Sequence, residues 1–128
     1  MNFGLKDKVA LVAASSKGLG RAVAEELGAE GAALVMCARE AGPLEDAKRA
    51  IVEGSGVDVV AMVADLSDAV QLDRLVQEGI DHFGHIDILV TNTGGPPAGP
   101  FEAHSPEVWR EAMQQNLESV LNLTRGVL

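Results

Sequence analysis

The amino-acid sequence predicts an α/β protein built on a doubly wound parallel sheet with the strand order 3-2-1-4. Four apolar segments of strand length alternate with segments of helical periodicity along the 128 residues. The apolar segments are continuously hydrophobic rather than alternating, which is typical of parallel strands buried on both faces. A glycine-containing turn joins the first apolar segment to the first helical one. Together these observations favour an open sheet with helices on each side.

The boundaries of the elements follow from hydrophobic periodicity and from local start and stop signals. Strands are expected at residues 9–13, 32–38, 57–64 and 86–91. Helices are expected at about residues 18–30 and 43–53, after Asp68, and from Ser105 onward. The expected inward face of the first helix contains Leu19, Ala22, Val23 and Leu27.

Two helix starts carry specific signals. Asp68 with Gln71 three residues later resembles a capping box. Ser105-Pro106 is a favourable pair of N-cap and first-turn residues. Between these helices, residues 94–100 (Gly-Gly-Pro-Pro-Ala-Gly-Pro) form a loop at the carboxyl end of the fourth strand. Loops at that end of an open α/β sheet line its ligand crevice.

Composition bounds the class of protein. With 47% hydrophobic residues the chain can bury one core, so residues 1–128 are interpreted as a single domain. The sequence contains no apolar run of membrane-spanning length and no signal-peptide pattern, and a cytoplasmic protein is expected. The net charge of −9 argues against nucleic acid and anionic membranes as partners. Cys37, the single cysteine, falls in a predicted buried strand and is expected to be inert.

The turn before the first helix is the strongest functional signal. Its sequence is Ala13-Ala14-Ser15-Ser16-Lys17-Gly18-Leu19-Gly20. Such a turn exposes backbone N–H groups at a helix N-terminus, where the helix dipole favours an anion. Glycine allows a pyrophosphate to approach the backbone because it has no Cβ. The turn therefore predicts dinucleotide binding.

The spacing of this turn resembles the T-G-x-x-x-G-x-G motif of the short-chain dehydrogenase/reductase family, with Ala13 and Ala14 replacing Thr and the first Gly. Three further elements resemble the family in the same order along the chain: Asp65-Leu66, Asn92-Thr93-Gly94-Gly95, and Asn116. The run Asn-Thr-Gly-Gly-Pro-Pro is similar to a bacterial branch that includes 3-oxoacyl-carrier-protein reductases. The resemblance implies a Rossmann-like, cofactor-binding half of an oxidoreductase.

The resemblance also implies roles for particular residues. The cofactor phosphates would be wrapped by the turn residues Ala14, Ser15, Ser16, Lys17, Gly18, Leu19 and Gly20. Asp65 and Leu66 would contact the adenine, and the riboses would lie along Asn92, Thr93 and Gly94. The Ala14 methyl would either fit because φ is negative there or crowd the adenosine.

Cofactor choice depends on two cations. Dehydrogenases that prefer NAD carry an acid after the second strand, but Ala38 is neutral here and Arg39 follows it. A guanidinium can pair bidentately with a 2′-phosphate. Lys17 resembles the family's other basic determinant for NADP. The expected cofactor is therefore NADP rather than NAD.

Asn116 is the one candidate catalytic residue. It is expected on an apolar helix stripe, where a buried amide must find partners. The stripe consists of Trp109, Ala112, Met113, Leu117, Val120 and Leu121. By the resemblance Asn116 would hold a water and a main-chain group in a proton relay; the alternative is a structural Asn that satisfies backbone groups.

The family's catalytic Ser, Tyr and Lys have no counterpart here, since the sequence has no tyrosine and its last lysine is Lys48. The sheet is accordingly expected to be truncated before the later strands, and the chain alone is expected to be inactive. Two readings stay open: the cofactor half of an oxidoreductase acting on a carbonyl or secondary alcohol, or a non-catalytic nucleotide-binding half-domain or interaction module. A phosphoacceptor receiver or flavodoxin-like domain would leave Arg39 unexplained. No metal site is proposed, because His82 and His85 lie near a helix end. A homo-oligomer is expected through the helix that carries Asn116.

Overall fold

The computed structural model describes residues 2–94 and 98–128. Within these residues it contains a parallel sheet in the order β3-β2-β1-β4, as the sequence predicts. The strands are β1 (Val9–Val12), β2 (Ala33–Ala38), β3 (Val59–Val63) and β4 (Ile88–Val90). Ala10 in β1 stands opposite Leu34 of β2 on one side and Ile88 of β4 on the other. All four strands consequently end at the same edge of the sheet.

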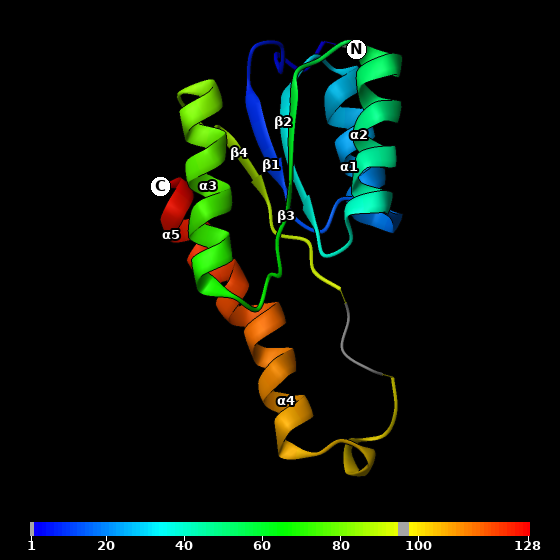
Figure 1. Ribbon diagram of the computed structural model, residues 1–128, viewed down its shortest axis with the longest axis vertical. Coiled ribbons are helices and arrows are strands. Elements are labelled where there is room, and N and C mark those ends of the chain that lie inside the picture. The colour runs from blue at the N-terminus through cyan, green and yellow to red at the C-terminus, as the bar shows by residue number, and fades with distance from the viewer. Residues whose placement is uncertain (1, 95–97) are drawn as a thin grey trace.

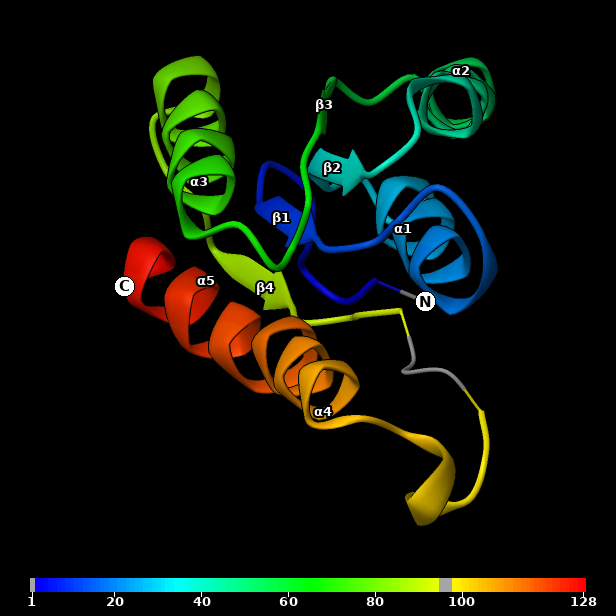
Figure 2. The ribbon, with the colours of Figure 1, turned by 60° about the horizontal axis from the view of Figure 1, so that its bottom comes forward.

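Helices cover both faces of the sheet (Figures 1 and 2). One face packs against α1 (Gly18–Ala29) and α2 (Ala41–Ser55), and the other against α3 (Ala69–Phe83) and α5 (Ser119–Val127). Along β1 the side chains alternate between two buried clusters, because Ala10 and Val12 face α1 and α2 while Leu11 faces α3. The continuous apolar character of β1 thus reflects burial on both faces.

The last helical segment extends beyond the sheet. After the 3₁₀ turn η1 (Phe101–Ala103), α4 (Pro106–Met113) leads through a π-helical turn η2 (Gln114–Glu118) directly into α5. Ser105 caps α4 as predicted, accepting a hydrogen bond from the Val108 N–H at 3.4 Å. α4 projects past the carboxyl edge of the sheet in Figure 1, and none of its residues is buried.

The predicted inward face of α1 is confirmed in part, because Val23 and Leu27 are partly buried and pack against the core. Leu19 is 80% exposed and Ala22 is exposed, so neither belongs to the inward face. The buried positions are instead the small residues Gly20, Ala24 and Gly28. They allow a close approach: a Cβ on Gly28 would lie 3.1 Å from Cγ2 of Ile51 in α2. Close helix packing therefore outweighs the burial of the larger side chains.

Element ends differ by one or two residues from the predicted ones. Helix α2 begins at Ala41 rather than at Pro43, so Pro43 lies in its first turn. Proline is tolerated there, because the N–H group that it lacks would have no intrahelical acceptor in the first turn. The strands are shorter than predicted because their apolar runs continue into the adjoining loops. In the described residues no helix is both long and apolar enough to span a bilayer.

The amino edge of the sheet is fixed by two acid–histidine pairs. His82 Nε2 lies 2.8 Å from Asp58 Oδ2, and His85 Nε2 lies 3.0 Å from Asp87 Oδ2. Asp87 Oδ2 also accepts from the Val9 N–H at 2.9 Å. These contacts join the ends of α3, β3, β4 and β1 at the edge opposite to the glycine turn.

Candidate cofactor-binding site

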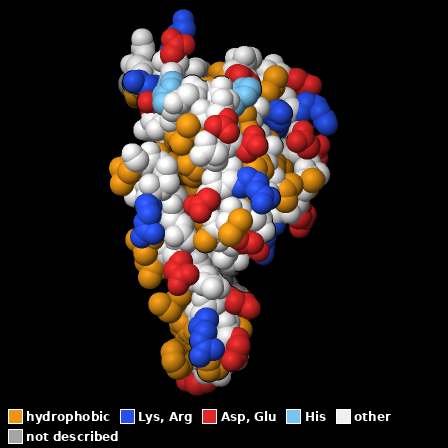
Figure 3. Space-filling model, turned by 60° about the vertical axis from the view of Figure 1, so that its left-hand side comes forward, with side chains coloured by type: hydrophobic (Ala, Val, Ile, Leu, Met, Phe, Trp, Pro, Cys, Tyr) orange, Lys and Arg blue, Asp and Glu red, His pale blue; other side chains and the backbone are white. Residues whose placement is uncertain are grey.

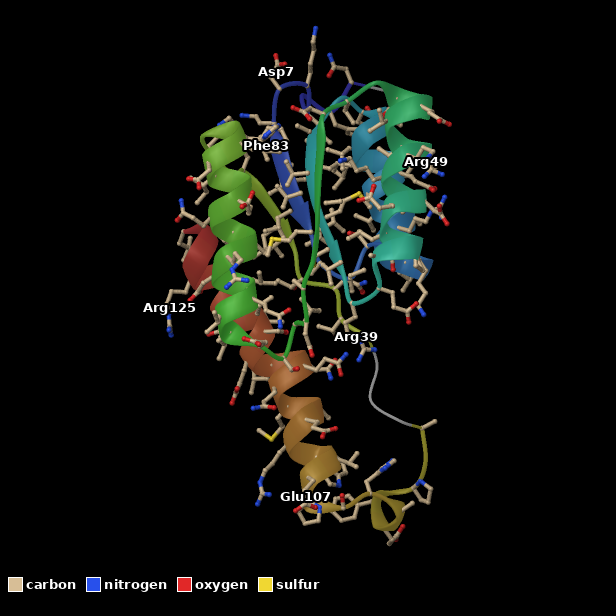
Figure 4. All side chains as sticks on the ribbon, viewed as in Figure 1. Asp7, Arg39, Arg49, Phe83, Glu107 and Arg125 are labelled. Carbon is tan, nitrogen blue, oxygen red and sulfur yellow. The ribbon has the colours of Figure 1, made fainter. Side chains whose placement is uncertain are left out.

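A cavity of about 310 Å³ opens at the carboxyl edge of the sheet. Figure 4 shows Arg39 at this edge, with Asp7 and Phe83 at the opposite end of the molecule. The lining residues are Ala14, Ser16, Lys17, Gly18, Leu19, Cys37, Ala38, Arg39, Glu40, Pro43, Ala64, Asp65, Leu66, Asn92, Thr93, Gly94 and Gln115. The structure thus brings together eleven of the thirteen predicted cofactor-binding residues; Ser15 and Gly20 are not in the lining.

Ser15 holds the glycine turn on the sheet. Its hydroxyl donates to the Val12 carbonyl at 2.8 Å and accepts from the Cys37 N–H at 3.3 Å. Its own N–H donates to the Cys37 carbonyl at 2.9 Å. The buried hydroxyl therefore connects β1 to β2, and a phosphate contact by Ser15 stays a prediction.

Gly20 packs against the backbone of the same turn. A Cβ at this position would lie 2.1 Å from the Ala14 carbonyl oxygen and 2.7 Å from Nδ2 of Asn92. The Asn92 amide donates to that carbonyl at 3.1 Å. The missing side chain of Gly20 therefore lets the turn, the start of α1 and the end of β4 meet at one point.

Ala14 has a left-handed backbone conformation, with φ of 49°. The alternative that the methyl fits because φ is negative is wrong. An L-residue in this region places its Cβ close to the following carbonyl, at a cost of roughly 1–2 kcal/mol. The family's glycine at this position would carry no such strain.

The substitution Ala14→Gly is accordingly expected to stabilise the fold by about 0.5–1 kcal/mol, because the relief of strain exceeds the extra entropy that glycine gives the unfolded chain. The measurement is the free energy of unfolding in urea. Ala22→Gly is the matched control: Ala22 is exposed within α1, and its replacement is expected to cost about 1 kcal/mol. A loss of stability in Ala14→Gly comparable to the control would contradict the strain argument.

Within the part of the chain that the structure describes, no side chain caps the N-terminus of α1. Lys17, at the N-cap position, has extended backbone and makes no side-chain capping bond, and the first turn contains no acidic residue. Gly18, the first helical residue, has φ of 61°, which favours glycine. The first-turn N–H groups and the positive end of the helix dipole consequently face the cavity beside Lys17 and Arg39. This combination suits a phosphate or pyrophosphate group.

Asp65, which follows β3, also lines the cavity. Its Oδ1 accepts from the Ser67 hydroxyl at 2.7 Å and from the Ser67 N–H at 3.0 Å. The Ser67 hydroxyl, the Ser67 N–H and, more weakly, the charge of Arg39 hold the pKa of the Asp65 carboxyl below its usual range, while partial burial opposes them. Asp65 is therefore ionised at neutral pH and acts as a hydrogen-bond acceptor.

Asn116 lies in the π-helical turn η2 and is exposed, so the expectation of a buried amide is wrong. The stripe turns outward because α4 and η2 extend past the sheet, which leaves Trp109, Met113 and Leu117 between 43% and 56% exposed. The amide is nonetheless held: Asn116 Nδ2 donates to the Ala112 carbonyl at 2.8 Å, and Thr93 Oγ1 donates to Asn116 Oδ1 at 2.5 Å. Asn116 does not line the cavity but is connected to it through Thr93.

Sequence reasoning missed several lining residues. Glu40 directly follows Arg39, Pro43 comes four residues after it, and Gln115 directly precedes Asn116. Proximity in the chain to a predicted site residue was therefore the only signal in the sequence for these three. Gln115 Nε2 lies 3.0 Å from the place that a Cβ on Gly94 would occupy. The predicted loop at residues 94–100 falls partly at 95–97, outside the described residues; Gly94 itself lines the cavity.

Cys37 lies at the base of the cavity, within β2. It is fully buried, and this burial raises the pKa of its thiol, with a hydrogen bond from the Ala14 backbone opposing the shift. The thiol therefore stays neutral at physiological pH, in keeping with the small, inert side chain expected from the sequence.

Comparison with known proteins gives a consistent result. The sequence profile of the short chain dehydrogenase family matches residues 8–128. The 3-oxoacyl-[acyl-carrier-protein] reductase FabG of Escherichia coli K12 is 31% identical over 128 residues, which is all of this chain and 50% of that protein. The chain spans about half the length of the curated relatives it matches.

Solved structures agree with this match. L-sorbose reductase from Gluconobacter frateurii, complexed with NADPH and L-sorbose, superposes with a TM-score of 0.95 and 32% identity over 99% of this chain and 48% of its own. The F189W variant of actinorhodin polyketide ketoreductase with NADPH superposes with a TM-score of 0.89 and 30% identity. The match covers 100% of this chain and 48% of the ketoreductase chain. The profile match covers nearly the whole chain, and the parallel sheet and glycine turn agree with it: this chain belongs to the short-chain dehydrogenase family.

Proposed function

We propose that this chain binds NADP at the carboxyl edge of its sheet and forms the cofactor-binding part of an oxidoreductase that interconverts a carbonyl and a secondary alcohol. The observation that carries the proposal is the placement of an uncapped helix N-terminus and two cations, Lys17 and Arg39, around one cavity. NADPH occurs in the complexes of the L-sorbose reductase and the actinorhodin ketoreductase. The resemblance to FabG makes 3-oxoacyl thioesters a candidate substrate class.

The residues present fit such a dinucleotide. First-turn N–H groups of α1 would receive the pyrophosphate, and the absence of a side chain on Gly20 keeps the turn tight against Asn92. Arg39 and Lys17 would pair with the 2′-phosphate through charge-assisted hydrogen bonds. Asp65 would accept a hydrogen bond from the exocyclic amine of adenine, since its carboxylate is ionised and faces the cavity.

When bound, the nicotinamide ring would supply or accept the hydride. The protein's contribution on this side of the reaction is positioning: Asn92, Thr93 and Gly94 would lie along the riboses. Asn116, held by Thr93, would orient a main-chain group and a water for proton transfer. The absence of tyrosine means that these 128 residues contain no counterpart of the family's proton donor.

We also propose that the protein self-associates through the outward face of α4, η2 and α5. Trp109, Met113, Leu117 and Leu121 are each between 43% and 56% exposed and lie four residues apart, on one side of the helical run. Figure 3 shows apolar side chains gathered along this projecting part of the surface. An apolar stripe of this kind on a soluble protein marks an interaction surface.

Fluorescence titration of the chain with NADPH tests the proposed cofactor. We expect saturable binding, displaced by 2′,5′-ADP more effectively than by 5′-AMP, because only the former offers the 2′-phosphate to Arg39 and Lys17. We expect no oxidation of NADPH in the presence of a 3-oxoacyl thioester, because the chain has no tyrosine. Absence of NADPH binding, or equal displacement by the two nucleotides, would overturn the proposal; turnover by the purified chain would overturn the expectation of inactivity.

A further inference from the structure

We propose that Gln71 is a positioning residue that holds Asp65 in place to read the adenine ring of a bound dinucleotide. The inference rests on the proposed function, since it concerns how the same cavity recognises the purine. Gln71 itself does not line the cavity, so its influence must pass through Asp65. It lies in the first turn of α3, on the side of the sheet edge where β3 ends.

The Gln71 side-chain amide makes two directed hydrogen bonds. Its Oε1 accepts from the Asp65 N–H at 2.8 Å, and its Nε2 donates to Asp68 Oδ2 at 3.0 Å. Asp68 in turn caps α3, because its Oδ1 accepts from the N–H groups of Val70 and Gln71. The orientation of the amide is fixed at both ends, and Oε1 is thereby directed at the Asp65 backbone.

This arrangement differs from a reciprocal capping box. There, the side chain at the third helical position accepts from the N–H of the N-cap residue itself. Here the Asp68 N–H donates to the Asp65 carbonyl at 3.0 Å, which leaves Gln71 to reach three residues further back. The N–H of Asp65 is therefore bound by the first turn of α3, and its carbonyl by the N-cap residue Asp68. Gln71, which the sequence predicts to pair with Asp68 at the start of the helix, thus also contacts the cavity-lining residue Asp65.

The Asp65 carboxylate has one oxygen available for a ligand. Ser67 donates twice to Oδ1, whereas no hydrogen bond from the described residues reaches Oδ2. A carboxylate accepts from the exocyclic amine of adenine but repels the carbonyl oxygen at the same position of hypoxanthine. Discrimination between these bases requires Oδ2 to stay in one place. Loss of the hydrogen bond between Gln71 and the Asp65 N–H leaves the Asp65 backbone less fixed and should reduce that discrimination.

The experiment compares binding of NADPH with binding of its hypoxanthine analogue, reduced nicotinamide hypoxanthine dinucleotide phosphate. Gln71→Met keeps the length of the side chain but removes the amide, while Gln71→Glu keeps an acceptor for the Asp65 N–H and replaces the donor to Asp68 with a carboxylate that repels Asp68. We expect the wild-type preference for the adenine cofactor to fall at least about threefold in Gln71→Met and to fall less in Gln71→Glu. Asp65→Asn gives the ratio of the NADPH affinity to the analogue's affinity for a side chain that lacks the carboxylate.

A merely structural role would lower both affinities together and leave their ratio unchanged in Gln71→Met, and that result would overturn the proposal. Equal changes of the ratio in Gln71→Met and Gln71→Glu would also overturn it. Amide hydrogen exchange provides a second measurement that needs no ligand: the Asp65 N–H should exchange faster in Gln71→Met than in Gln71→Glu, and equal rates would count against the inference. A wild-type chain that binds no NADPH would instead overturn the proposed function, and one that binds both cofactors equally would overturn the reading of adenine by Asp65.

Discussion

Replacement of Arg39 by aspartate is expected to reverse the preference of the chain from NADP to NAD. Charge-assisted hydrogen bonds contribute roughly 1.5–3 kcal/mol each, so Arg39 and Lys17 should favour NADP by at least about tenfold in the wild type. In Arg39→Asp the carboxylate repels the 2′-phosphate and accepts from a 2′-hydroxyl. The ratio of the two affinities should therefore change by about a hundredfold. Titration of both cofactors against both proteins measures it.

Arg49→Asp is the matched control, because it makes the same change of charge at a distance from the cavity. Arg49 lies on the outer side of α2, where it forms an exposed contact of 3.5 Å with Asp46 (Figure 4). The cofactor ratio should stay at the wild-type value in this variant. Equal affinity of the wild type for NAD and NADP would show that Arg39 points away from the ligand.

Gly20→Ala should cause the largest loss of stability among single substitutions at the turn. The new Cβ would lie 2.1 Å from the Ala14 carbonyl oxygen, which is backbone and cannot rotate aside. Separating α1 from the turn also breaks the Asn92–Ala14 hydrogen bond. We expect a loss of about 3 kcal/mol in the free energy of unfolding and a drop of at least about a hundredfold in NADPH affinity. Urea unfolding and fluorescence titration measure the two effects.

Gly54→Ala tests whether the effect is specific to the close approach. A Cβ on Gly54, in α2, meets no atom within 4 Å, so alanine there should raise stability by about 0.5–1 kcal/mol through its helix propensity. If Gly20→Ala were as stable as Gly54→Ala, the contact between α1 and the turn would have to be looser than described.

The sheet order could be predicted because it depends on local patterns that the tertiary structure preserves. Each buried strand is continuously apolar, each is followed by a helix, and right-handed crossovers then restrict the arrangement. The location of the cavity followed from the same logic, because Lys17, Arg39 and Asp65 each come after a strand and parallel strands end at one edge. Both the sheet order and the location of the cavity depend on the direction of the strands rather than on side-chain packing.

Side-chain environments could not be derived in the same way. Asn116 lies on a helical stripe of apolar residues, but the stripe faces outward because its helix extends past the sheet. Leu19 is exposed because α1 approaches its neighbours through Gly20 and Ala24. The positive φ of Ala14 depends on the turn as a whole, since alanine alone disfavours that conformation. In each case a tertiary contact determines what the local pattern leaves open.

The pairing of β1 with β4 has a consequence for how the chain folds. Ala10 meets Leu34 of β2 after a short separation in sequence, but its partner Ile88 in β4 comes 78 residues later. Closing the longer loop costs more chain entropy, and such distant pairings raise contact order and slow folding. Among the described residues, the Ala13 N–H and the Ala14 carbonyl obtain their acceptor and donor from Val90 and Asn92. During synthesis the glycine turn can therefore mature only after residue 92 has left the ribosome, so acquisition of the proposed nucleotide affinity would report a late event in the formation of the domain.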